Sequence, residues 1–131
     1  MKKEDIIVPV SSGELIDKIA ILKIKKKKIF NKSKLKNINN ELYLLNEIYK
    51  NNFKNNKKLL LYEKKLIKIN KKLWDIEDKI RFLESKKNFN QQFIDLARAI
   101  YINNDKRSEI KKKINKLTGS RLIEEKSYKS Y

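Results

Sequence analysis

The sequence predicts an all-α fold, an elongated bundle of about five helices in a single domain over residues 1–131. The chain has only two glycines and one proline, too few for the many turns of an all-β fold. Its apolar residues recur at spacings of three and four, which is the helical period. Residues 57–86 keep this spacing through four heptads, which indicates a long, coiled-coil-like third helix.

The first ten residues predict a short extended lead-in, because Pro9 disfavours helical geometry in the residue before it. A first helix is expected over about 12–31. Its start carries a capping box, with Ser11 as the N-cap and Glu14 three positions later. Asp17 lies inside the apolar part of this helix, and a buried carboxylate needs a partner.

A second helix is expected over about 34–53 and the third over 57–86. The third helix carries one seam of eight apolar residues and a parallel apolar stripe beside it, so we expect it to contact two neighbours, with the first two helices as possible partners of the seam. The seam consists of Leu59, Tyr62, Leu66, Ile69, Leu73, Ile76, Ile80 and Leu83.

A fourth helix is expected over about 90–103, where the polar stretch INND should break it. Asp105 is then a suitable N-cap for a fifth helix over about 106–117. Gly119 is the expected C-terminal stop. The tail 119–131 contains several large apolar and aromatic residues, so we expect it to fold back on the bundle.

The formal net charge is +18, from 34 basic and 16 acidic residues, which favours a nucleic-acid or other polyanionic partner. A competing explanation is base composition. Lys, Ile and Asn, which AT-rich codons specify, make up 64 of the 131 residues, whereas Gly, Ala, Arg and Pro make up ten. The lysine run 23–28 has the same two interpretations, a solvated helix end or a nucleic-acid contact.

The chain contains no cysteine and no histidine, which excludes disulfides, thiol nucleophiles and the commonest transition-metal ligands. We therefore expect no cofactor and no metal. The start of the chain lacks a signal-peptide pattern, and no stretch approaches the length of an apolar bilayer span. The sequence predicts a soluble cytoplasmic protein without a membrane partner.

Scarce arginines lie close to acidic residues in the expected third and fourth helices. Arg81 is one of only four arginines, beside 30 lysines, and it shares a helix face with Trp74, Glu77 and Glu84. A retained arginine can mark a planar, bidentate contact. Two interpretations stay open: an ion-pair network that joins Asp17, Glu77 and Glu84 to Arg81 and Arg98, or a ligand site. The full candidate set is Glu14, Asp17, Lys18, Trp74, Glu77, Asp78, Arg81, Glu84, Asp95, Arg98, Asp105 and Arg107.

Four stretches together resemble a bacterial family known only as a domain of unknown function. They are VPVSSGELIDKIAIL (8–22), LWDIEDKIRFLE (73–84), FIDLARAIYINNDKR (93–107) and INKLTGSRLIEEKSY (114–128). The resemblance covers nearly the whole chain and is weakest over 31–58. It implies no activity and assigns no role to the candidate residues, or to Glu124, that fall inside these stretches.

Three functions remain as hypotheses. The favoured one is a non-catalytic helical interaction module, with a protein partner or a second copy of itself, through the seam of the third helix or an exposed apolar stripe. Another is binding to nucleic acid or a different polyanion, weak and sensitive to salt. The third is a binder or hydrolase of a phosphorylated small molecule, in which arginines hold phosphate and carboxylates hold magnesium. An enzyme is the less favoured class.

Overall fold

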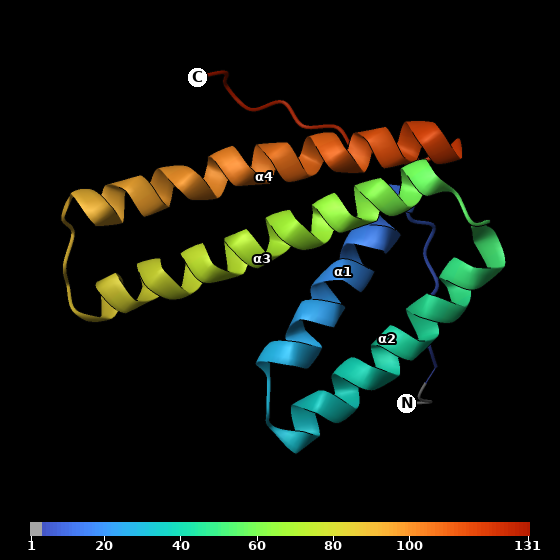
Figure 1. Cartoon of the computed structure of the whole chain (residues 1–131), viewed down its shortest axis with the longest axis horizontal. Coiled ribbons are helices and arrows are strands. Elements are labelled where there is room, and N and C mark those ends of the chain that lie inside the picture. Colours follow the sequence, from blue (N-terminus) through green and yellow to red (C-terminus); the bar gives the residue numbers. More distant parts are fainter. Residues whose placement is uncertain (1–3) are drawn as a thin grey trace.

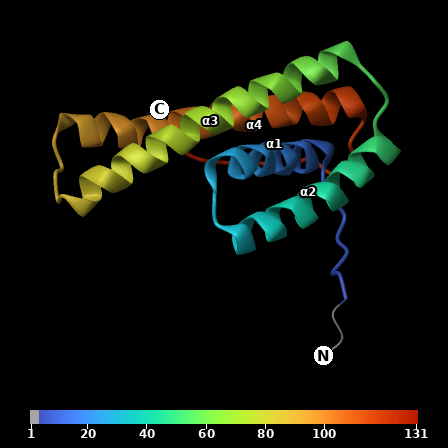
Figure 2. The ribbon, with the colours of Figure 1, turned by 60° about the horizontal axis from the view of Figure 1, so that its bottom comes forward.

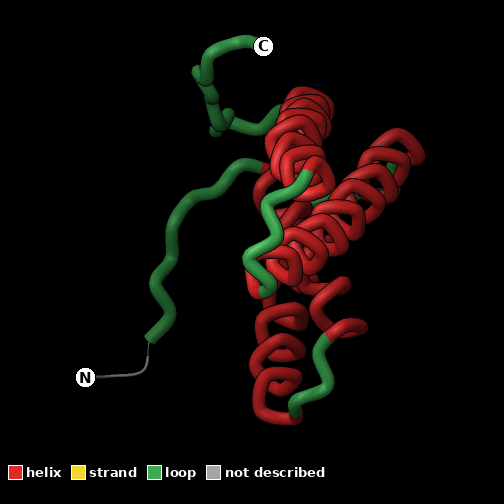
Figure 3. Tube along the Cα trace, turned by 90° about the vertical axis from the view of Figure 1, so that its left-hand side faces the viewer, coloured by secondary structure: helices red, strands yellow, loops and turns green. Residues whose placement is uncertain are grey.

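The computed structural model describes residues 4–131, and over this range the chain forms four helices and no strand (Figures 1 and 3). The helices are α1 (Ser12–Lys28), α2 (Lys32–Asn52), α3 (Lys57–Ser85) and α4 (Gln91–Thr118). The all-α prediction is confirmed, whereas the expected count of five helices is wrong. None of the four helices has both the length and the apolar character that a bilayer crossing requires.

Helix α1 contacts all the other helices. Helices α3 and α4 form an antiparallel hairpin, and α1 packs against both of them near the start of α3 and the end of α4 (Figures 1 and 2). Helix α2 packs on α1. The core therefore has two parts, one on each side of α1: the first is Leu15, Ile19, Leu22, Ile38 and Leu42, and the second is Ile16, Ala20, Leu59, Leu66 and Ile114.

The stretch INND does not break the helix, and α4 runs through it without interruption. Asp105 is therefore an interior helical residue, and the N-cap of α4 is Asn90, whose side chain accepts the N–H of Phe93 at 3.0 Å. Asparagine and aspartate disfavour a helix interior only by fractions of about 1 kcal/mol each. The side chain of Asn103, which is 3% exposed, donates to the carbonyl of Ala99 at 2.7 Å and so remains compatible with the helix.

The other helix ends lie close to the expected ones. Helix α1 ends at Lys28 rather than near residue 31, because Asn31 caps the next helix and accepts the N–H of Lys34 at 3.0 Å. Helix α3 ends at Ser85, one residue before the expected end. Gly119 follows α4 with φ of 65°, the left-handed geometry expected of a C-terminal stop.

The seam of α3 is occupied inside the chain. Its buried members include Leu59, Leu66, Leu73, Ile76 and Leu83, and the helices that pack on α3 are α1 and α4. Of the two possible partners of the seam, α1 packs along α3, whereas α2 reaches the cluster of Leu59 and Leu66 through Tyr49 and Phe53. Because this seam is already buried, it is not available for contact with a second copy of the chain.

Both chain ends lack regular secondary structure (Figure 3). In the lead-in, residues 4–11 are non-helical and the side chains of Ile6 and Ile7 are almost fully exposed. The expected lead-in 1–10 also includes residues 1–3, which lie outside the described residues. After Gly119 the tail turns back along α4 (Figure 1), and the Tyr131 hydroxyl donates to Asp105 Oδ2 at 2.6 Å.

The start of α1 lies so close to α4 that only glycine fits at position 13. A Cβ atom on Gly13 would lie 2.6 Å from the carbonyl oxygen of Lys111, which is a backbone atom and cannot rotate away. The absent side chain therefore sets the distance between the two helices.

Replacing Gly13 with alanine should destabilise the fold by about 2 kcal/mol, because the overlap with α4 outweighs the gain in helix propensity. Urea unfolding followed by circular dichroism measures the change. Ser12→Ala, one position earlier, is the control and should alter stability by less than about 0.5 kcal/mol. A Gly13→Ala protein as stable as the parent would contradict this packing.

Candidate functional site

Backbone N–H groups at the start of α1 all have acceptors. Ser12, Gly13 and Glu14 donate in turn to Ser120 Oγ at 3.2 Å, Asn115 Oδ1 at 2.6 Å and Ser11 Oγ at 3.1 Å. The predicted cap at Ser11 is confirmed. Because α4 and the tail supply the other two acceptors, this helix start is closed by protein and does not present free N–H groups to an anion.

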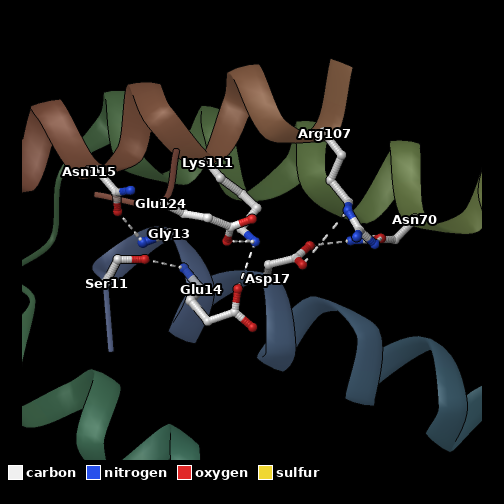
Figure 4. Close-up of polar contacts among 9 residues, drawn as sticks. All are labelled: Ser11, Gly13, Glu14, Asp17, Asn70, Arg107, Lys111, Asn115 and Glu124. Atoms are coloured by element: carbon white, nitrogen blue, oxygen red, sulfur yellow. Dashed lines mark hydrogen bonds and ion pairs between the residues drawn. The ribbon is translucent and has the colours of Figure 1, made fainter. Parts of the chain in front are cut away.

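Lys111 joins three segments of the chain (Figure 4). Its ammonium Nζ lies 2.7 Å from Glu14 Oε2 in α1 and 3.2 Å from Glu124 Oε2 in the tail. The side chain is only 11% exposed. Glu14 therefore does not complete the capping box with Ser11, because its carboxylate binds Lys111 on α4. This contact holds both α1 and the tail against α4.

The contacts of Lys111 shift two pKa values in opposite directions. Burial alone would lower the pKa of Lys111, but the hydrogen bonds to Glu14 and Glu124 outweigh it and raise that pKa above the usual 10.5. The hydrogen bond from Lys111 and its positive charge lower the pKa of Glu124 below the usual 4.5. Both shifts favour the charged forms, so the pair stabilises the folded state near neutral pH.

Asp17 has its partners on α3 and α4 (Figure 4). The carboxylate is buried, accepts Asn70 Nδ2 at 2.8 Å through Oδ1, and lies 3.9 Å from Arg107 Nε through Oδ2. Arg107 Nη1 donates to Asn70 Oδ1 at 3.2 Å, which closes a ring of three side chains. The prediction that Asp17 needs a partner is confirmed, but the arginine is Arg107 rather than Arg81 or Arg98.

We call these two sets of contacts the α1–α4 polar cluster; its charged members are Glu14, Asp17, Arg107, Lys111 and Glu124, and its neutral members are Ser11, Gly13, Asn70 and Asn115. Each charged member pairs with another inside the fold. A buried ion pair that satisfies itself in this way holds helices in register. This arrangement favours the structural interpretation of the cluster over the ligand interpretation.

The other predicted site residues are not brought into this cluster, and their polar contacts are local and exposed. Arg81 Nε lies 3.1 Å from Glu77 Oε2, Glu84 Oε2 lies 3.9 Å from Lys87 Nζ, and Asp95 accepts from Gln91 Nε2 at 2.8 Å. Exposed pairs between residues one turn apart contribute only about 0.3–0.5 kcal/mol. The predicted network through Arg81 and Arg98 therefore does not form.

Four more candidates do not form a common site. Lys18 is exposed and its Nζ lies 3.9 Å from Glu41 Oε1. Trp74 is half-buried in α3, whereas Asp78 and Arg98 are exposed. Within residues 4–131 no ion pair involves Arg98, and no group of three carboxylates lies close enough to hold a metal ion.

A cavity of about 440 Å³, open to solvent, lies between the tail and α4 beside the polar cluster. Asp105 and Arg107 line it from α4, and Lys126 and Tyr131 line it from the tail. The rings of Tyr101 and Tyr131 meet edge to face, with centroids 5.2 Å apart. Sequence reasoning did not single out Asn70, Lys111 or Asn115, which complete the cluster, or Ser120, which accepts the N–H of Ser12.

One comparison with known proteins gives a match. The model of a Family of unknown function (DUF6165) matches residues 6–131, so the chain belongs to this family. None of the curated proteins compared with the chain, and none of the solved structures, matches it. The family resemblance seen in the sequence is thereby confirmed, and it carries no activity with it.

Replacing Arg107 with alanine should lower stability by about 2 kcal/mol, because it leaves the buried Asp17 carboxylate without its cation. Arg98→Ala on the same helix is the matched control and should cost less than about 0.5 kcal/mol. Thermal and urea unfolding of both variants measure the difference. Equal losses in the two variants would show that the Asp17 ring does not stabilise the fold.

The contacts of Lys111 should make stability depend on pH at both ends of the range. The lowered pKa of Glu124 stabilises the fold above pH 4.5, and this contribution is lost as the pH falls below that value. The raised pKa of Lys111 stabilises it below pH 10.5, and this contribution is lost as the pH rises through the higher folded pKa. Melting temperatures measured across pH should fall less steeply below pH 4.5 in Glu124→Gln than in the parent. An unchanged acid limb would contradict the assignment.

Proposed function

We propose that this member of the DUF6165 family is a non-catalytic helical interaction module that self-associates through the far half of its α3–α4 hairpin. We call this part, residues 74–105, the hairpin tip. Support comes from its position, because the tip extends beyond α1 and α2 (Figure 1). Neither of the two core clusters contains a residue of the tip.

Large apolar side chains of the tip remain open to solvent. Ile76 and Leu83 are buried between α3 and α4, but two helices cover only the faces that they turn toward each other. The exposed fractions are 60% for Phe82, 54% for Phe89 and 47% for Ile94. Two such hairpins from separate chains would build a four-helix bundle, in which a third and a fourth helix cover these faces.

Charge distribution is the observation that carries the proposal. The tip contains six acidic and five basic residues, a net charge of −1, in a chain whose net charge is +18. The other 99 residues contain 29 basic and ten acidic residues, so like-charge repulsion disfavours contacts between two copies there. A near-neutral tip would reduce that repulsion, and its exposed Arg81–Glu77 pair is suited to the polar rim of an interface.

Replacing Ile94 with glutamate should convert a dimer into a monomer, because it places an unpaired charge in the apolar contact. Sedimentation velocity over a concentration series at physiological salt measures the change. Ile48→Glu on α2 is the matched control, with the same substitution at 46% exposure against 47% for Ile94, and it should leave the dimer intact.

Folding of both variants is checked by circular dichroism, and the fluorescence of half-buried Trp74 reports on the tip itself. A parent protein that stays monomeric at its highest soluble concentration would overturn the proposal. So would an Ile94→Glu variant that dimerises as the parent does.

A further inference from the structure

A second, separate surface lies between α2 and α3. Both helices pack on α1, and α2 approaches α3 through side chains at its C-terminal end, where Tyr49 lies beside Glu63. Helix α1 therefore forms the floor of a groove with α2 on one side and α3 on the other. Two adjoining cavities of about 250 and 530 Å³ share Lys23 and Ile67 and together form this groove. Apolar groups line it: Ile16, Ala20 and Ile24 from α1, Leu42 from α2, and Leu60 and Ile67 from α3.

Four lysines surround one end of the groove. Lys23, Lys26 and Lys27 lie on one face of α1 at helical spacing, and Lys71 faces them from α3. None of the four forms an ion pair within the described residues 4–131. The single acidic residue lining the groove, Glu63, lies in the other cavity. The lysine run of the sequence therefore provides a cationic rim beside an apolar floor.

The shape and the charge of the groove define its occupant. From Ile16 to Lys27 the floor is about 16 Å long, or roughly three helical turns. Grooves of this kind receive the apolar face of an amphipathic helix, which reads them through residues spaced three and four apart. An occupant that carries negative charge would complement the lysines. A second copy of this chain, with a net charge of +18, is poorly suited to that role.

We propose that this groove binds an amphipathic helix of an acidic partner protein, with Asp or Glu residues of that helix lying against Lys23, Lys26, Lys27 and Lys71. The helix would occupy the position of a missing helix in a bundle and would cover Leu60 and Ile67. This binding does not depend on self-association through the hairpin tip, because the groove and the tip share no residue.

The test uses a panel of fluorescein-labelled helical peptides of about 18 residues. Each has leucines on one face at different helical registers and glutamates on the flanks. A scrambled peptide of the same composition lacks the apolar face, and a labelled DNA duplex is the competing polyanion. Fluorescence anisotropy at physiological salt should show binding of at least one amphipathic peptide and binding at least about tenfold weaker for the scrambled one.

Two matched pairs of variants locate the binding. The double variant Lys27→Glu with Lys71→Glu reverses two rim charges, whereas Lys28→Glu with Lys72→Glu changes the net charge equally, one position along the same helices. The first should weaken peptide binding about tenfold and the second less than twofold. Leu60→Gln should weaken binding where Leu61→Gln, at a similar exposure but outside the groove, does not.

Three results would overturn the proposal. The first is that no peptide of the panel binds. The second is that the two double variants lose binding equally, which would indicate general charge attraction. The third is that duplex DNA binds more tightly than the peptides and loses affinity in the Lys27→Glu/Lys71→Glu variant, which would make the groove a nucleic-acid contact.

Discussion

Close packing of α1 on the end of α4 determines the arrangement of the whole molecule. It depends on Gly13, which lets the α1 backbone approach that of Lys111, and on Asn115, which accepts the Gly13 N–H at 2.6 Å. Because α1 is fixed at this end of the hairpin, it covers only the near half of α3 and α4. Because α2 packs mainly on α1, it does not cover the rest. The open groove and the uncovered hairpin tip therefore have one cause.

The helices themselves were predictable from the sequence, and the reason is local. Ser11, Asn31 and Gly119 act on backbone groups within four residues of themselves, so their effect can be read from the chain. The error at INND came from giving local propensity more weight than tertiary packing. Read through that stretch, α4 has one seam at spacings of four and three, namely Leu96, Ile100, Asn103, Arg107, Ile110, Ile114 and Leu117. The seam continues, but two of its positions carry polar side chains.

The polar cluster was predictable only in part. The sequence shows that Asp17 lies among apolar residues and that arginine is scarce. Together these two observations predict that Asp17 pairs with an arginine. Which arginine meets Asp17 depends on the register of α1 against α4, and no periodicity within either helix contains that information. Lys111 is harder still, because it is one of 30 lysines and lies in a lysine-rich stretch. Only its position opposite Gly13 distinguishes it from its solvated neighbours.

Base composition accounts for the amount of positive charge in the chain but not for its distribution. A general drift toward AT-rich codons would add lysine along the whole chain, and it accounts for the excess as a total. It does not account for the placement, because residues 74–105 hold five basic and six acidic residues while the other 99 residues hold 29 basic and ten acidic. A segment that stays near neutral under such a drift is under a constraint that opposes added charge. The proposed contact between two hairpin tips would impose such a constraint, because like charges at a symmetric contact would face each other directly.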